Sequence, residues 1–393
     1  MKLVKINAKK IFTARLSLKL QPKQNPKPSY SNCIAMFLLT TLSILIFTAV
    51  LPNISKYYYD CGLAFSKLDD KEKLVKNYNQ AIKLNPKNAT IYINRGISRF
   101  NLGDIKGAIQ DYNQAIKLKP KYIDAYIIRG IARSDLGDNK SAIKDYNQAL
   151  KLDPKCARTY ADRGSVRTDL GDYKGAIKDF NQAIKLDPKY AWAYNCRGVA
   201  RSKLGDYKDS IKDFNQSLEL DPKNSWAYYD NRGNAHFKLH EKDGALKDYN
   251  QSIKLNPKNA DAYYNRGILL FNLGDKIGAI NDFNQSIKLN PKNADAYYNR
   301  GNERSDLGDK DGALKDYNQA IKLVPQYLDA YINRGNLLFN IGNNEGAIKD
   351  FDRAIKLDPK NAKAYYCRSK VRKKMGNKEG SENDYNKYLE SIK

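Results

Sequence analysis

The chain has 393 residues, with 69 Lys and Arg against 43 Asp and Glu, which gives a formal net charge of +26. This excess favours acidic partners, phosphate-bearing surfaces or anionic lipid, and it bears on association rather than on fold. The five cysteines, Cys33, Cys61, Cys156, Cys196 and Cys367, form no C-x-x-C pair and no evenly spaced framework, which argues against a disulfide scaffold or a zinc site.

The N-terminal segment contains no Asp or Glu before Asp60, and residues 1–32 carry seven Lys and one Arg. An uncharged run rich in Leu, Ile and Phe follows at residues 33–51. Nineteen helical residues at ~1.5 Å each nearly span a ~30 Å hydrocarbon core. A cleaved signal peptide is the alternative, but the leader is long and the run ends in a poor cleavage site. We expect a disordered basic leader (1–32) and a transmembrane anchor (33–51).

The distribution of basic residues around residues 33–51 predicts the topology. Arg15, Lys19, Lys23 and Lys27 precede the run within about 20 residues, and three lysines follow it at a similar distance. Because basic residues are retained on the cytosolic side, we expect a single-pass membrane protein whose remaining residues lie on the non-cytosolic side.

Prolines punctuate the rest of the chain at a fixed period. They stand at Pro86, Pro120, Pro154, Pro188, Pro222, Pro257, Pro291, Pro325 and Pro359, 34 residues apart except for one interval of 35. In a representative unit, residues 260–293, one helix is expected to end at Gly274, Asp275 to cap a second helix, and Pro291 to prevent its continuation. A fixed period of this kind indicates a repeat architecture.

This unit resembles the tetratricopeptide repeat. Gly267, Ala279, Phe283 and Pro291 stand at the eighth, twentieth, twenty-fourth and thirty-second positions, where that family places a small residue, an alanine, an aromatic residue and a proline. The resemblance implies an all-α, right-handed solenoid over residues 55–393. Its ten repeats are 55–88, 89–122, 123–156, 157–190, 191–224, 225–259, 260–293, 294–327, 328–361 and 362–393.

An arginine replaces the family's large apolar residue at the seventh position of nine repeats, and the same nine carry an aspartate at the twenty-third position. Arg266 with Asp282 and Arg300 with Asp316 are examples. The first repeat lacks both residues, having Cys61 and Asn77. This joint absence favours an ion pair within each repeat over one between neighbours, with a structural rather than a catalytic role.

No nucleotide-binding, metalloprotease or hydrolase motif occurs in the chain, so we expect no enzymatic activity, cofactor or metal. The two histidines, His236 and His240, have the spacing of a helical metal pair but no third ligand nearby. Both lie in the sixth repeat, which is one residue longer than the others. We place the extra residue at Asp230, inside the first helix, where it predicts a π-bulge or kink.

The family resemblance implies that the first helix of each repeat lines a concave groove, and repeats six to nine would present tyrosine and asparagine there. A side-chain amide both donates and accepts hydrogen bonds, so a row of amides can hold an extended peptide backbone without demanding a sequence. The candidate binding residues are Tyr229, Asn231, Tyr264, Asn265, Tyr298, Asn299, Asn302, Asn333 and Asn336.

The sequence therefore predicts a membrane-anchored scaffold that holds a protein or extended peptide in its groove. The alternative is a binder of anionic polymer, nucleic acid or acidic glycan, through lysines that recur on the second helices, such as Lys178 and Lys185. We consider nucleic acid the less favoured partner, because a stripe of charge on a helix is usually a solvated face.

Overall fold

A computed structural model describes residues 71–222 and 225–392. These residues form nineteen helices and no strand. The helices are α4 (Lys71–Leu84), α5 (Ala89–Leu102), α6 (Ile105–Leu118), α7 (Ile123–Asp135), α8 (Asn139–Leu152), α9 (Ala157–Asp169), α10 (Tyr173–Leu186), α11 (Ala191–Lys203), α12 (Tyr207–Leu220), α13 (Trp226–Lys238), α14 (Lys242–Leu255), α15 (Ala260–Asn272), α16 (Lys276–Leu289), α17 (Ala294–Asp306), α18 (Lys310–Leu323), α19 (Leu328–Asn340), α20 (Asn344–Leu357), α21 (Ala362–Lys374) and α22 (Lys378–Ser391).

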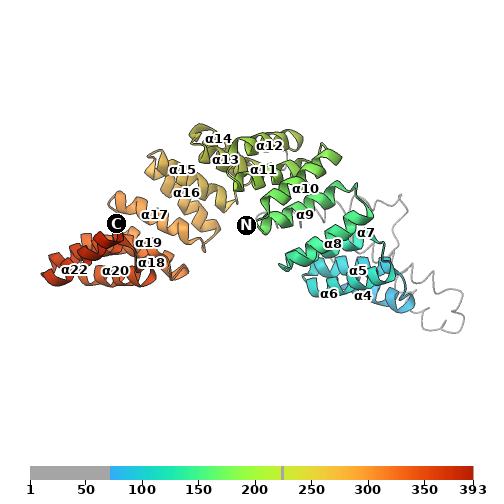
Figure 1. Cartoon of the computed structure of the whole chain (residues 1–393), viewed down its shortest axis with the longest axis horizontal. Helices are drawn as coiled ribbons and strands as arrows, with labels where there is room; N and C mark the ends of the chain where they lie inside the picture. The colour runs from blue at the N-terminus through green and yellow to red at the C-terminus, as the bar shows by residue number, and fades with distance from the viewer. Residues whose placement is uncertain (1–70, 223–224, 393) are drawn as a thin grey trace, which may run out of the picture. The chain divides into compact units, whose positions relative to one another are not determined.

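The helices pack in pairs (Figure 1). The chain divides into two compact units, one through Leu204 and one from Gly205. Within each unit the second helix of a pair also packs against the first helix of the next pair, and successive first helices touch. This is the nearest-neighbour stacking of an α-solenoid, in which each repeat buries its apolar face against the next.

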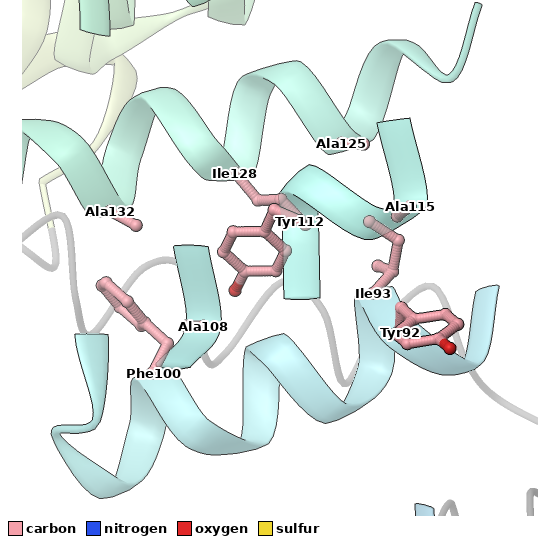
Figure 2. Close-up of a cluster of buried hydrophobic side chains, with 9 residues drawn as sticks. All are labelled: Tyr92, Ile93, Phe100, Ala108, Tyr112, Ala115, Ala125, Ile128 and Ala132. Atoms are coloured by element: carbon pink, nitrogen blue, oxygen red, sulfur yellow. The ribbon is translucent and has the colours of Figure 1, made fainter. Parts of the chain in front are cut away.

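The packing of each pair depends on a small residue facing an aromatic one. A Cβ added to Gly267 of α15 would lie 2.7 Å from Cε1 of Phe283 in α16, closer than the two atoms can approach. The glycine therefore lets the two helices come together over the buried ring. Figure 2 shows the equivalent cluster of the second repeat, where Tyr112 of α6 lies among side chains from α5 and α7.

The turn inside each repeat is built from a left-handed residue followed by a helix cap. Gly274 adopts a φ of 84°, and the Asp275 side chain accepts a 2.8 Å hydrogen bond from the backbone N–H of Gly278. In the sixth repeat His240 takes the glycine's place with a φ of 61° and is the only non-glycine residue with positive φ among those described. Glu241 makes no cap bond there. This turn is therefore the strained one.

The sixth repeat also corrects the predicted position of the extra residue. Helix α13 has 13 residues, as α15 does, so it contains no insertion. Residues 221–225 separate α12 from α13, whereas only residues 256–259 separate α14 from α15. The extra residue lies in this connection, where it leaves every helical hydrogen bond intact. Asp230 consequently aligns with Tyr264, and Tyr229 with Tyr263.

The prediction of a single-pass membrane protein is corrected by the described helices, none of which is long and apolar enough to cross a bilayer. They have 13 or 14 residues, or ~20 Å at ~1.5 Å per residue, against a hydrocarbon core of ~30 Å. The predicted leader (1–32) and anchor (33–51), and the first helix expected in repeat 55–88, lie outside the described residues. The prediction that the remaining residues lie on the non-cytosolic side depended on that anchor and is therefore not supported either.

Replacing His240 with glycine should stabilise the protein by about 1 kcal/mol, because a side chain in the left-handed region costs roughly that much. The reverse change at the matched turn, Gly274→His, should destabilise it by a similar amount. Urea unfolding of both variants measures the two effects. A loss of stability in the His240→Gly variant would contradict the assignment of strain to this turn.

Candidate functional site

The recurring arginine and aspartate lie against each other within eight of the repeats. Arg266 of α15 donates from Nε and Nη2 to the two carboxylate oxygens of Asp282 in α16, both at 2.7 Å. Asp282 is 4% exposed, so the carboxylate of this ion pair is buried. The same bidentate contact joins Arg95–Asp111, Arg129–Asp145, Arg163–Asp179, Arg232–Asp248, Arg300–Asp316, Arg334–Asp350 and Arg368–Asp384.

Each of these arginines also reaches the preceding repeat, which the sequence analysis did not foresee. Nη1 of Arg266 donates a 2.6 Å hydrogen bond to Oδ1 of Asn250 in α14. The equivalent contacts are Arg95–Asn79, Arg129–Asn113, Arg163–Asn147, Arg197–Asn181, Arg232–Asn215, Arg300–Asn284, Arg334–Asn318 and Arg368–Asp352. The guanidinium therefore ties three helices from two repeats together.

A tyrosine three residues before each arginine completes this arrangement. The Arg266 guanidinium carbon lies 5.7 Å from the ring centre of Tyr263, within the range of a cation–π contact. Tyr229 has the same place beneath Arg232, at 5.4 Å. We call the arginine, together with its aspartate, asparagine and tyrosine partners, the arginine junction. Tyr229, proposed from the sequence as a groove residue, is part of this junction.

The asparagine row, defined as Asn231, Asn265, Asn299 and Asn333, runs along α13, α15, α17 and α19. Asn299 Nδ2 donates to the hydroxyl of Tyr264 in the preceding repeat at 3.1 Å. Asn333 Nδ2 donates to the Tyr298 hydroxyl and to Oδ1 of Asn302, both at 2.9 Å. Tyrosine and asparagine thus alternate across the repeats, and all of these side chains are half-buried. The surface that they form is called the first-helix face below.

Further amides extend the first-helix face. Asn302 accepts a 2.9 Å hydrogen bond from the Tyr317 hydroxyl, and Asn336 is bonded to the Cys367 thiol. Asn234 accepts from Tyr249 at 2.8 Å in the same way as Asn302, although the sequence analysis did not select it. The position of Asn234 two residues after Arg232, which is that of Asn302 after Arg300, was the signal that could have identified it.

Asp230 occupies the place that Tyr264 and Tyr298 hold in the next two repeats. Its side chain is buried, its Oδ1 has no hydrogen-bond partner among the described residues, and Asn265 donates to the carboxyl group. Burial, with a smaller contribution from the nearby Asp261 carboxylate, raises the pKa of Asp230 to about 7, although the hydrogen bond from Asn265 acts in the opposite direction. A buried, incompletely bonded carboxyl group destabilises the fold by about 1–3 kcal/mol, so its presence calls for a functional reason.

The histidines offer no metal centre. His236 Nδ1 lies 2.5 Å from Glu241 Oε2, and His240 stands exposed in the turn. Within residues 71–222 and 225–392 there is no cluster of three or more His, Cys, Asp or Glu side chains that could hold a metal ion.

The chain belongs to the tetratricopeptide repeat family. Models described as TPR repeat or tetratricopeptide repeat match residues 73–103, 96–137, 123–156, 164–205, 191–224, 233–274, 260–293, 283–315, 301–342 and 335–376. No catalytic family matches over these residues, and proteins of this repeat class are generally non-enzymatic scaffolds. No curated protein matches the chain.

Solved structures share the fold. A tetratricopeptide repeat protein from Parabacteroides merdae is 21% identical with a TM-score of 0.54, and the match covers 63% of this chain and 98% of that one. The Cut9–Hcn1 hetero-tetramer of the APC/C matches with 17% identity and a TM-score of 0.53, over 77% of this chain and 60% of that one. At these identities the likeness shows the fold alone.

Asp282→Ala should destabilise the protein by about 3 kcal/mol, at the lower end of the range for breaking a buried ion pair, because it leaves Arg266 without its main acceptor. The double variant Arg266→Ala with Asp282→Ala should lose much less stability than the sum of the losses in the two single variants, which corresponds to a coupling energy above about 1 kcal/mol. The exposed pair Lys276–Asp306, joined at 2.8 Å, is the control and should show no coupling. Chemical denaturation of the four variants of each cycle tests this.

Asp230→Asn should make the protein less sensitive to pH. With a pKa of about 7 in the folded state and about 3.9 unfolded, Asp230 holds a proton only when folded between these values, so stability falls as pH rises from about 4 to 7. The variant should therefore gain stability over the wild type at pH 8 and little at pH 5. Urea midpoints at both pH values measure it, with exposed Asp243→Asn as control. A difference independent of pH would show that Asp230 does not titrate as proposed.

Proposed function

We propose that this chain is a non-enzymatic scaffold that holds an extended segment of a partner protein on the first-helix face of repeats six to nine. The observation that carries the proposal is the asparagine row, an amide at the same position of four consecutive repeats, with two further amides, Asn302 and Asn336, on the next turn. A structural role alone would not require a polar side chain at this position, because the third and fifth repeats have Ile128 and Cys196 there.

The hydrogen bonds on this face leave groups suited to a peptide backbone. Asn299 and Asn333 use Nδ2 to reach the tyrosine hydroxyls, and an amide oxygen can accept the N–H groups of a ligand. Burial raises the pKa of Tyr264 to about 12, so its hydroxyl is protonated at neutral pH and has a proton to donate. The face therefore offers acceptors and donors in alternation, which is the pattern of an extended main chain.

The tyrosines also supply contact area. Tyr298 lies 5.0 Å from Tyr327 and 6.2 Å from Tyr317 between ring centres, and Tyr264 lies 6.0 Å from Phe283. Rings held by their neighbours lose little conformational entropy when a ligand covers them, so they favour binding. In the concave groove that the family resemblance implies, these rings would flank the bound segment.

Replacing Asn265, Asn299 and Asn333 together with alanine should abolish the binding of peptides selected from a random twelve-residue display library. The stability of the variant should fall by only about 1 kcal/mol for each hydrogen bond lost. A matched control replaces Gln251, Gln285 and Gln319, three amides on the second helices of consecutive repeats, and should bind as the wild type does. Circular dichroism establishes that both variants stay helical.

Two outcomes of this experiment would contradict the proposal. One is selected peptides that bind the asparagine variant as tightly as the wild type. The other is the selection of acidic peptides alone, with binding that weakens steeply as salt is raised and disappears when Lys247, Lys254 and Lys315 are neutralised. The second result would favour the anionic-polymer alternative, because such binding releases counterions.

A further inference from the structure

The first-helix face carries a row of aspartates along α15, α17 and α19, although the chain as a whole has a net charge of +26. Asp261, Asp295 and Asp329 stand at the second position of three consecutive repeats, in the first turns of α15, α17 and α19. Asp261 is half-buried, and the other two are exposed. The ion pairs of these repeats use other carboxylates, such as Asp282 and Asp316.

Each of these aspartates lies beside a polar residue of the preceding repeat. Burial raises the pKa of Tyr264 and of Tyr298, and the negative charge of Asp295 and of Asp329, respectively, raises it as well. Asp261 acts on Asp230 in the same way. With the asparagine that follows in each case, these contacts define three acidic steps. The steps are Asp230–Asp261–Asn265, Tyr264–Asp295–Asn299 and Tyr298–Asp329–Asn333.

Stabilisation of the helix N-termini accounts for only part of this arrangement. A carboxylate in the first turn of a helix interacts favourably with the helix dipole, which suffices for Asp261, Asp295 and Asp329 taken one at a time. Asp230 lies beyond the first turn of α13, where the helix dipole has little effect, and it is buried and close enough to Asp261 for that carboxylate to raise its pKa. Two adjacent carboxyl groups, one with an oxygen that has no partner among the described residues, form a site that a cation would complete.

The arginines of these first helices are already paired with aspartates of the second helices, as Arg266 is with Asp282 and Arg300 with Asp316. Exposed lysines such as Lys247, Lys254 and Lys315 lie on the second helices α14 and α18. Screening at physiological salt limits the effect of these lysines to about 8 Å.

We infer that the three acidic steps receive lysine or arginine side chains of the bound segment, with Asp230 and Asp261 as the anchoring pair. This inference rests on the proposed peptide-binding function and adds the charge of the ligand to it. Packed helices lie ~10 Å apart. An extended ligand in the polyproline II conformation has three residues per turn and advances ~3.1 Å per residue, so side chains three positions apart lie on the same side, ~9 Å from each other. A cationic residue at every third position of such a ligand matches the steps, with the tyrosine rings adding cation–π contacts.

Fluorescence anisotropy with the full chain and three synthetic twelve-residue peptides tests this inference. The first peptide carries lysine at every third position among serine and glycine, and the others carry glutamine or glutamate in place of lysine. We expect the lysine peptide to bind at least tenfold more tightly than the glutamine peptide. Asp230→Asn with Asp261→Asn should remove most of that preference, while the matched neutralisation of exposed Asp243 and Asp311 on second helices should leave it unchanged.

The pH profile supplies a second readout that a purely structural role of Asp230 would not produce. Besides Asn265, the groups that act on Asp230 are Asp261 from α15 and Tyr249 from α14. A bound cation favours the ionised carboxylate, so affinity for the lysine peptide should rise several-fold between pH 6 and pH 8. Asp230→Asn, which is isosteric, should abolish this rise.

The outcomes separate this inference from the proposed function. Equal binding of the lysine and glutamine peptides, lost in the Asn265, Asn299 and Asn333 variant, would overturn the inference and leave the peptide-binding function standing. Preference for the glutamate peptide would overturn the inference as well. Absence of binding by all three peptides, together with a failed selection from the random library, would overturn both.

Discussion

The architecture of this protein depends on one guanidinium group in each repeat from the second to the tenth. The arginine at the seventh position is held by the aspartate of its own second helix, by an asparagine of the preceding repeat and by a tyrosine ring on its own first helix, as Arg266 is by Asp282, Asn250 and Tyr263. Most members of such a fold would bury an apolar side chain here. The planar fork of arginine instead gives a directional contact that fixes how one repeat sits on the next.

The use of arginine at the seventh position explains why the adjoining surface can be polar. Since the arginine junction and the buried aromatic pairs, such as Gly267 against Phe283, already hold the repeats together, the neighbouring positions on the first helices need not be apolar. Tyr264, Asn299 and Asp295 therefore contribute to a surface that presents hydrogen-bonding groups and negative charge. The same repeats carry further positive charge on the second helices, such as the exposed Lys247 and Lys315.

Much of the fold follows from the sequence, because glycines, prolines and aspartates mark the helix ends every 34 residues and these signals act locally. Gly274 and Asp275 behave as a local argument predicts. The contact between Arg266 and Asn250 did not follow, since it depends on how two repeats stack. The extra residue of the sixth repeat was predicted at the wrong place because Tyr229 can be aligned with either Tyr263 or Tyr264, and only the bounds of α13 decide between the two. Of the proposed binding residues, those of α15, α17 and α19 lie together, whereas Tyr229 belongs to the junction. The predicted anchor lay outside the described residues, and the helices that are described are too short to replace it.

The turn at His240 has a consequence for how the molecule comes apart. In a linear array each repeat is stabilised mainly by its two neighbours, so unfolding need not be all-or-none and begins where the sum of local terms is smallest. The sixth repeat combines a strained turn, an uncapped α14 and a buried carboxyl group. Its amides should therefore exchange with solvent sooner than those of the seventh and eighth repeats, and a protease would find its first opening there. The repeat that should unfold and be cleaved first therefore adjoins the surface that we assign to the partner.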